Sequence, residues 1–287
     1  MSTQITTAFV RDYKQGVAVL AQQKGSRLRG AVRYETLSSG DRAAFDQISA
    51  VSASKITTRN ADTPNIDVPH SRRWVLPDAY DWGTLLDRPD QVRALNDFAG
   101  PYQMNAANAM GRAMDDAIID AAFAASVTGV NAAGTSSFDT SGYGIASSSA
   151  GMTLAKVLNA KEILDAAEND PDEPRFIALQ AGQVTDLLNT TEVKSSDYNT
   201  VKALAAGQID TFAGFKFIRT QRLDTVSSER ACIAWCKNSL LLGVNQDIRV
   251  RIDERSDKRY ATQVYVTMDI GAVRMDDTGV VRILCTE

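Results

Sequence analysis

Two runs of alternating apolar and polar residues near the C-terminus place the strongest constraint on how this chain folds. In the first run, DIRVRID, the apolar residues Ile248, Val250 and Ile252 occupy every second position. The second run, TQVYVTMDI, ends at Ile270 and has the same period. Because successive side chains of a strand point to opposite faces, each run gives one apolar face. We therefore expect two long antiparallel strands with one face buried, followed by a third strand, VVRILC.

A long helix is expected upstream of these strands. Pro101 suits the first turn of a helix, and from there to about Ala125 the only further helix breaker is Gly111. A shorter helix is expected to start at Asp87-Arg88-Pro89 and to end before Ala99-Gly100-Pro101. The segment that follows the long helix, residues 126–151, is rich in Gly and Ser and is typical of a flexible loop.

A compact α/β unit is expected from about residue 152 to 245. Its pattern alternates a helix capped by Thr153, the buried strand RFIALQ, the helix AGQVTDLLNT, a helix at Asn199 to Ala206, and the strands FAGFKFIRT and ACIAWCKNSLLLGV. Together with the long antiparallel strands, this unit predicts an α+β fold.

Two N-terminal segments carry patterns that do not complete a core of their own. The apolar run VAVLAQQ is interrupted by KGSRLRG, and residues 1–58 contain eight Lys or Arg against four acids. We interpret residues 1–50 as a basic arm that packs on something else. Residues 55–82 contain Pro64, Pro69 and Pro77 among β-prone runs, which favours a projecting hairpin with edge-like strands.

Composition narrows the possible functions. The chain has 287 residues, a net charge of -4 and 44% hydrophobic residues, which indicates a folded, globular protein. It has neither an apolar run near the ~20 residues that span a bilayer nor an N-terminal secretory pattern. His70 is the only histidine, which disfavours most general-base and His-based metal mechanisms. The three cysteines have no framework spacing, so we expect reduced, buried thiols.

The segment AMGRAMDDAIIDAAFA (109–124) groups three aspartates on one helix. Helical spacing predicts that Arg112 pairs with Asp115 and Asp116, with Asp120 one turn further on. Met110, Met114 and Ile118 belong to the opposite, core-facing stripe. Ile119 and Phe123 lie on the side of the acids, so this side is expected to meet another element or another subunit. A metal site would need ligands from other segments, and none is evident.

Other candidate chemistries are weaker. GVNAAGTS (129–136) has the glycine and serine spacing of a phosphate-binding loop but has Thr135 where the lysine is required, and it follows a helix rather than a strand. The residues Arg72-Arg73-Trp74 could bind nucleic acid by charge and stacking. A cationic strand edge that pairs with a neighbouring subunit is the favoured interpretation. We therefore expect no catalytic residue, no metal site and no cofactor.

The candidate contacts to other subunits or to DNA come from the arm, the hairpin and the long helix. They are Arg27, Arg29, Arg33, Arg72, Arg73, Trp74, Arg112, Asp116, Ile119, Asp120 and Phe123.

Several segments, in this order along the chain, resemble the major capsid proteins of tailed double-stranded DNA phages. They are KGSRLRGAV, RRWVLPDAYDW, AMGRAMDDAIIDAAF, LLNTTEVKSSDYNTVKAL, IDTFAGFKFI and DIRVRIDERSDKRYATQVYVTMDIGAVRMDD. The resemblance covers essentially the whole chain and implies the Hong Kong 97-like coat fold. It implies an N-terminal arm at 1–50, an extended hairpin loop at 51–86, and a peripheral domain at 87–151 with a spine helix and a flexible loop. An axial domain at 152–245 and a return to the peripheral sheet at 246–287 complete the fold.

The same resemblance implies a structural function. Coat subunits of this kind assemble as pentamers and hexamers into an icosahedral head that encloses double-stranded DNA, inside the host cytoplasm, and become part of the virion. Because the chain shows no long helical N-terminal extension, we expect a separate scaffolding protein, together with a portal protein and, in some heads, cement proteins. Two alternatives stay open at this stage: an encapsulin-like compartment with the same fold, and a cytosolic enzyme that uses Asp115, Asp116 and Asp120.

Overall fold

The computed structural model describes residues 20, 22–38, 40–59, 62–63, 65–87, 99–189 and 211–286. The helix expected to start at Asp87-Arg88-Pro89, the helix expected at Asn199 to Ala206 and most of the VAVLAQQ run lie outside these residues.

The long C-terminal strands lie in a four-stranded sheet, called the peripheral sheet, as their alternation predicts. Its strands are, in spatial order, β1 (Arg33–Thr36), β13 (Leu240–Arg255), β14 (Ala261–Arg274) and β4 (Asp78–Leu86). β1 runs parallel to β13, and β14 is antiparallel to both of its neighbours. Val264, Val266 and Met268 on β14 are at most 1% exposed, so one face of this strand is buried. The expectation of a buried face is wrong for the corresponding run on β13, because Val250 and Ile252 are 41% and 45% exposed.

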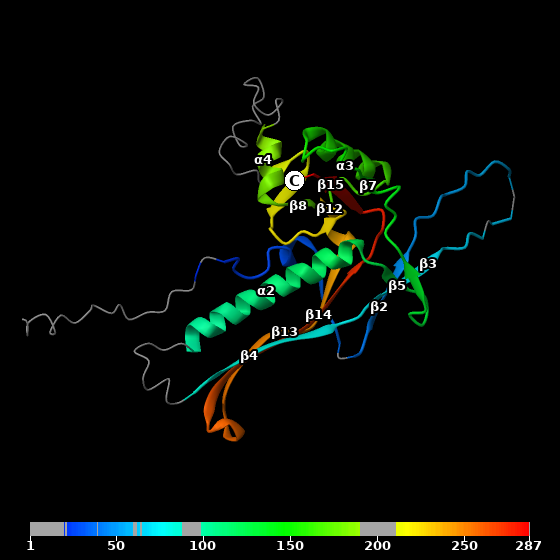
Figure 1. The fold of residues 1–287 in the computed structure, drawn as a ribbon. Coiled ribbons are helices and arrows are strands. Elements are labelled where there is room, and N and C mark those ends of the chain that lie inside the picture. The colour runs from blue at the N-terminus through cyan, green and yellow to red at the C-terminus, as the bar shows by residue number, and fades with distance from the viewer. Residues whose placement is uncertain are drawn as a thin grey trace, which may run out of the picture.

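Helix α2 (Ala99–Phe123) lies along the buried face of the peripheral sheet (Figure 1). Pro101 lies in its first turn, where its fixed φ angle suits a helix and its missing N–H costs nothing. Met110, Met114 and Ile118 are almost fully buried, which confirms the predicted core-facing stripe. Residues 22–28, called the arm segment, run across another face of the same helix.

The axial domain is built on a second sheet. Its main path is β7 (Gly144–Ile145), β15 (Val280–Cys285), β12 (Glu229–Cys236), β8 (Arg175–Leu179), β10 (Phe215–Arg219) and β9 (Thr211–Phe212), and β11 (Thr225–Val226) pairs with β12. Helices α3 (Leu154–Ala166) and α4 (Ala181–Asn189) belong to the same domain. The side chain of Thr153 caps α3 as predicted, accepting from the backbone N–H of Lys156. All three cysteines are buried free thiols, also as predicted.

Two strands lie in different sheets from those expected. β15 belongs to the axial sheet and not to the peripheral sheet: it pairs with β12 on one edge and β7 on the other, and helix α3 packs against it. Its apolar run suits this position because most of its residues are buried. β13 begins at Leu240, and its first residues already pair with β14 in the peripheral sheet. The chain therefore passes from the axial sheet to the peripheral sheet between β12 and β13, and it returns to the axial sheet between β14 and β15.

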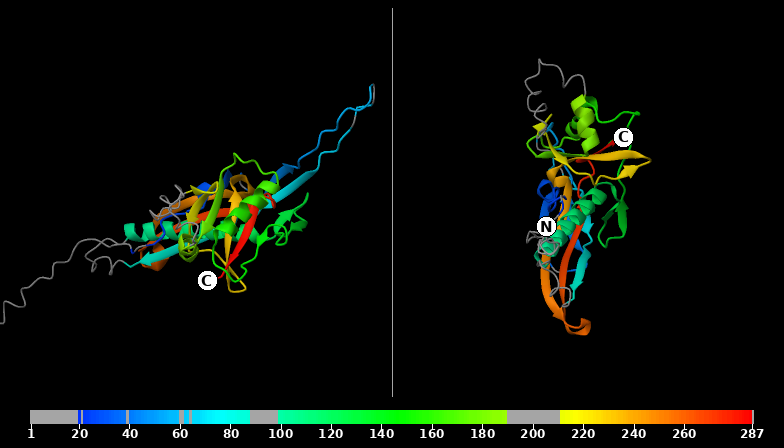
Figure 2. Two further views of the ribbon diagram at one scale, coloured as in Figure 1. Left: turned by 90° about the horizontal axis from the view of Figure 1, so that it is seen from above. Right: turned by 60° about the vertical axis from the view of Figure 1, so that its left-hand side comes forward.

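A third, smaller sheet carries the hairpin. Its order is β2 (Ala43–Ile48), β3 (His70–Val75), β5 (Ser126–Thr128) and β6 (Gly134–Ser136). The hairpin thus begins at Ala43, earlier than the expected range 51–86, and β4 lies in the peripheral sheet instead. Residues 49–59, 62–63 and 65–69, called the projecting loop, extend away from the rest of the chain (Figures 1 and 2).

The loop expected at residues 126–151 contains three short strands that its composition did not predict. This segment supplies β5 and β6 to the hairpin sheet and β7 to the axial sheet. Ser126 and Ile145 are 3% and 8% exposed. These short strands form from small residues because neighbouring strands and buried side chains hold them in place. The composition of the segment alone does not show that such neighbours exist.

Candidate functional site

Asp115, in the middle of α2, holds the arm segment against the helix. Its buried carboxylate accepts hydrogen bonds from the Ser26 hydroxyl (2.5 Å) and from the backbone N–H groups of Arg27 and Leu28 (3.1 Å each). The side-chain amide of Gln23 donates to the same carboxylate. These donors offset the cost of burying a charged group. Asp115 is therefore a structural anchor for the arm segment.

Two glycines let the arm segment approach the helix closely. A Cβ atom on Gly111 would lie 2.4 Å from the carbonyl carbon of Gly25, far closer than real Cβ contacts. Gly25 has a φ of +65°, which favours glycine. Its N–H also donates to the side chain of Asn108 (3.3 Å). This face of α2 is thus covered by the chain's own arm.

The predicted pairing of Arg112 with the neighbouring aspartates is corrected by these contacts. Arg112 donates instead to the side chain of Gln22 (2.7 Å) in the arm. Asp115 is turned toward the arm, and Asp116 forms a two-pronged ion pair with Arg222, which follows β10. The physical reason is that α2 is enclosed by the sheet, the arm and the axial domain, so its charged side chains meet partners far away in sequence.

Asp116 and Asp120 line a cavity of about 480 Å³ between α2 and residues 221–224 of the axial domain. Partial burial and the carboxyl group of Asp224, to which Asp120 is hydrogen bonded, raise the pKa of Asp120. Asp116 adds to this effect in the same direction. The helix therefore touches the axial domain through one ion pair and one carboxyl pair.

Ile119 and Phe123, which were candidate contacts, lie against other parts of their own chain. Ile119 is 2% exposed and belongs to the main core, so its expected role as a subunit contact is replaced by a role in folding. Phe123 packs edge to face against Phe138, with ring centroids 5.2 Å apart. The guanidinium of Arg282 lies over the Phe123 ring at 5.8 Å. The apolar residues on the acid-bearing side of α2 are thus covered from within the chain, whereas Asp120 on the same side is exposed.

The three arginines proposed for the arm all have partners in the chain. They pair as follows: Arg27 with the carbonyl oxygen of Arg219 (2.6 Å), Arg29 with Asp247 (2.7 Å), and Arg33 with Glu35 (2.8 Å). Arg29 also lies 4.9 Å from the ring centre of Tyr34. The hydrogen bond to Asp247 raises the pKa of Arg29, which keeps this side chain charged. The charges of Arg29 and Arg33 are thus balanced by carboxylates, whereas Arg27 meets a neutral carbonyl oxygen.

Neighbouring residues of β3 point to opposite faces of the hairpin sheet. Arg72 faces solvent and pairs across the hairpin with Asp46, directly opposite in register. This hydrogen-bonded pair holds the pKa of Asp46 below its usual value. Trp74, on the same face, donates its ring N–H to the carbonyl of Gly129 (2.6 Å) in the β5–β6 turn. These two contacts tie the hairpin strands to one another and to β5–β6.

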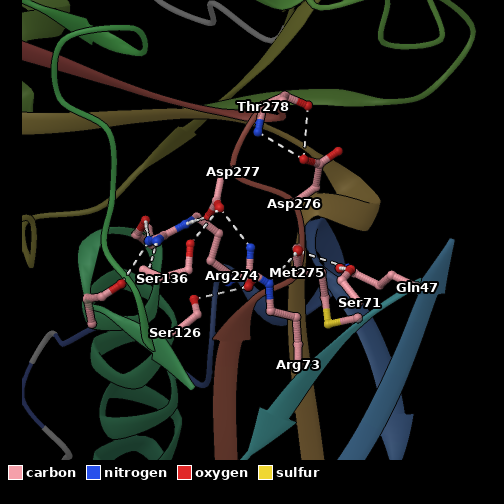
Figure 3. A network of polar contacts seen from close by, with 12 residues as sticks. Gln47, Ser71, Arg73, Ser126, Ser136, Arg274, Met275, Asp276, Asp277 and Thr278 are labelled. Carbon is pink, nitrogen blue, oxygen red and sulfur yellow. Dashed lines mark hydrogen bonds and ion pairs between the residues drawn. The ribbon is translucent and has the colours of Figure 1, made fainter. Parts of the chain in front are cut away.

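Arg73 points the other way and enters a buried polar network that Figure 3 shows from close by. It forms an ion pair with Asp277 (2.7 Å) and donates to the carbonyl oxygen of Met275 (3.2 Å). Asp277 also accepts from Arg274 (2.6 Å) and from the hydroxyl of Ser136 (2.9 Å). We call Arg73, Arg274 and Asp277 the clamp. It joins the hairpin to the turn between β14 and β15 and to the β5–β6 hairpin.

Arg274 extends the clamp to the end of the long helix. Its side chain is fully buried, and one terminal nitrogen donates to the carbonyl oxygens of Ala122 (2.9 Å) and Ala124 (2.8 Å). The last carbonyl groups of a helix lack partners within the helix, and they carry partial negative charge. A buried guanidinium therefore caps the C-terminus of α2 and fixes it relative to Asp277.

The charge of Asp277 is stabilised by the clamp. Burial on its own raises the pKa of this carboxyl group, but hydrogen bonds from Arg274, Arg73 and Ser136 outweigh burial and lower it. Asp277 is thus charged over the normal pH range. Two arginines that are each at most 10% exposed share this single carboxylate.

The projecting loop exposes apolar side chains for which the described residues offer no cover. Ile56 is 88% exposed, and other apolar residues of the loop and its base are 40–67% exposed: Ile48, Val51, Ile66 and Val68. Large apolar side chains at the end of a long hairpin are costly in water and mark an interaction site.

Catalytic and membrane-spanning features do not stand out in the described part of the chain. Among those residues, no group of three or more His, Cys, Asp or Glu side chains is placed to hold a metal ion. Within the same ranges, none of the helices combines the length and the apolar character needed to cross a bilayer. The aspartates of α2 are engaged with the arm, Arg222 and Asp224.

The clamp was missed from the sequence, although one signal pointed to it. Residues 264, 266, 268 and 270 form the buried face of β14, and Arg274 has the same parity in the strand. An arginine on the buried face of a strand requires a carboxylate nearby. The sequence MDD just after it supplies Asp277.

These features define a class of protein. An arm clasped along a long helix, a peripheral sheet under that helix, a hairpin that projects from a small sheet of its own and a separate axial sheet form the Hong Kong 97-like architecture of tailed-phage coat proteins. Solved capsid structures share it. The capsid of Ralstonia phage GP4 has a TM-score of 0.77 at 11% identity and covers 97% of this chain and 95% of its own.

Two further capsids give similar values. The head of Helicobacter pylori bacteriophage KHP40 has a TM-score of 0.75 at 12% identity, with 99% and 98% of the two chains covered. The capsid of cyanophage P-SCSP1u has a TM-score of 0.73 at 16% identity, with 100% and 96% covered. Because the sequence identities are low, these structural likenesses show a shared fold and nothing more. No curated protein matches the sequence.

The sequence itself establishes the family. A model described as phage capsid protein matches residues 5–287, which is nearly the whole chain. The chain belongs to the phage capsid protein family, and this family is a structural one.

Proposed function

We propose that this chain is the repeating subunit of an icosahedral phage head, in which it assembles as pentamers and hexamers around double-stranded DNA. The observation that carries the proposal, beside family membership, is the projecting loop with its exposed apolar side chains. A neighbouring copy is the occupant that a repeating shell supplies. Many modest contacts of this kind allow assembly errors to be corrected, and their combined avidity holds the closed shell together.

Contacts with DNA are proposed for only part of the arm. The side chains of Arg29 and Arg33 are 37% and 42% exposed, so both can meet a phosphate while keeping their intramolecular partners. The side chain of Arg73 is 10% exposed and its charge is used within the clamp, so it is withdrawn as a DNA contact. Neutralising phosphates with such arginines would make DNA binding salt-dependent.

The remaining partners follow from this role. We propose that assembly takes place in the host cytoplasm with a separate scaffolding protein, that one vertex holds a portal protein, and that the finished shell is part of the virion. Interactions with cement proteins belong to the same proposal.

The test is assembly of the purified chain, with and without co-expressed scaffolding protein, followed by light scattering and negative-stain electron microscopy. The variant Ile56→Asp places a charge on a side chain that is 88% exposed, so folding is unaffected while loop contacts are weakened. Leu158→Asp, on the exposed side of α3, is the matched control and is expected to give normal shells. A wild-type chain that stays a monodisperse monomer or dimer under every salt and scaffold condition would overturn the proposal.

A further inference from the structure

The hairpin is a long lever with a short base. From Val75 back to the middle of the projecting loop is about 16 residues, or about 50 Å of extended chain. β3 pairs with β5 at only two positions, Arg73 with Thr128 and Trp74 with Val127. A rotation of about 10° at this base would move the far end of a hairpin of that length by about 9 Å. Contacts with a neighbouring subunit depend on side-chain positions that are defined far more closely than this, so the orientation of the hairpin at its base has to be fixed.

Apolar packing at the base is modest. A small cluster formed by Leu37, Val75, Leu241, Val273 and Met275 is separate from the main core, and Phe45 of β2 packs against it. Apolar contacts of this kind are not directional and tolerate sliding. The packing therefore keeps the base dry but does not by itself define one angle.

The clamp defines the angle of the hairpin, which apolar packing alone does not define. Arg73 reaches from the hairpin to Asp277, and Arg274 reaches from the same carboxylate to the last carbonyl oxygens of α2 (Figure 3). Hydrogen bonds to a planar guanidinium are directional, and buried ion pairs are screened little by solvent. Gln47 of β2 adds a hydrogen bond to the carbonyl oxygen of Met275 (2.8 Å). The hairpin and the end of α2 are thus both linked to the carboxylate of Asp277, the hairpin through Arg73 and the helix through Arg274.

We propose that Arg73 is a positioning residue, which through Asp277 and Arg274 fixes the direction of the projecting hairpin relative to helix α2 and so presents the projecting loop where a neighbouring subunit can meet it. The consequence for assembly rests on the proposed shell function, whereas the fixed direction of the hairpin is a property of the single subunit. Buried ionic groups of this sort serve to specify one arrangement among several rather than to add stability.

The chain contains its own control. Arg72 and Arg73 are adjacent on β3, carry the same charge and each pair with an aspartate. Arg72 points to solvent and pairs within the hairpin, whereas Arg73 points into the base and pairs with the rest of the chain. The variants Arg72→Met and Arg73→Met remove the same group from opposite faces of one strand, so only the second removes the link to α2.

The direct measurement is the distance between two spin labels on the free subunit, one in the projecting loop (Ser54→Cys) and one on α3 (Asn159→Cys). Because the native cysteines are buried, labelling is confined to the new sites. Wild type and Arg72→Met are expected to give one narrow distance distribution. Arg73→Met is expected to give a distribution broadened or shifted by several ångströms. A distribution as narrow as that of wild type, at the same distance, would overturn the proposal.

A second variant and a second measurement separate a loss of the clamp from a failure to fold and from a failure to assemble. If Arg73→Met loses its circular dichroism signal, Asp277→Asn tests the same link with nearly unchanged volume, and an unchanged narrow distribution in that variant counts against the clamp. Electron microscopy of assembled particles then shows the consequence: Arg73→Met is expected to give irregular or open shells where wild type gives regular ones. Failure of every variant, wild type included, to form shells would refute the proposed function, while the spin-label result would still decide the clamp.

Discussion

Replacing Asp115 by alanine should release the arm from helix α2. Asp115 is fully buried and accepts hydrogen bonds from four groups of the arm segment. Hydrogen bonds to a charged group contribute about 1.5–3 kcal/mol each, but bonds that share one acceptor do not add fully. The variant also leaves the N–H groups of the arm without an acceptor. We expect the free energy of unfolding to fall by about 3–5 kcal/mol, a large part of a typical total.

Urea denaturation of the free subunit, followed by circular dichroism, measures this loss. Trypsin provides a local readout, because Lys24 and Arg27 lie in the arm segment and become cleavable when the arm leaves the helix. Asp253→Ala, at an exposed position of β13, is the control and should change stability by less than about 0.5 kcal/mol. If Asp115→Ala unfolds at the same urea concentration as wild type and its arm resists trypsin equally well, the arm is not held by this carboxylate.

Three further outcomes follow from the same contacts. Gly111→Ala should cost about 1–3 kcal/mol, because the new Cβ meets the backbone of Gly25, whereas Gly182→Ala in helix α4 has open space and should be neutral or stabilising by up to ~1 kcal/mol; equal urea midpoints would contradict the close approach. Arg274→Met should cost about 3–5 kcal/mol because it leaves Asp277 and the end of α2 unpaired, and a loss below ~1 kcal/mol in the same assay would exclude a strong cap. The lowered pKa of Asp277 adds stability that is present above the ordinary value of 3.8 and is lost as pH falls through its folded value. Acid titration should therefore destabilise wild type in this window more than Asp277→Asn, and parallel curves would contradict the assigned charge.

The regular elements were predictable because their periods are local. A repeat of two residues around Val250 and Val264 identifies β13 and β14, and a stripe such as Met110, Met114 and Ile118 identifies α2. Such patterns report which side of an element is apolar. They do not report what covers it.

The contacts at the candidate site were not predictable for that reason. Ser26 binds Asp115 across 89 residues of sequence, and Arg73 binds Asp277 across 204. Projection onto a helix gave Arg112 the nearest aspartates as partners, but tertiary packing gave each of them a partner from another element. Composition failed similarly at residues 126–151, where short strands depend on neighbours that the local sequence does not show.

The pairing of β4 with β14 also has a consequence for biosynthesis. Asp78 lies opposite Ile270, and β1 lies beside β13, so early segments find their partners only near the end of translation. At about 5–20 residues per second, a ribosome needs roughly 10–40 s to make the intervening ~190 residues. During this interval α2 has no sheet to cover it, and a prematurely terminated chain never acquires one. A chain that stops before β14 therefore lacks the strand that joins β13 to β4, and the peripheral sheet cannot form in it.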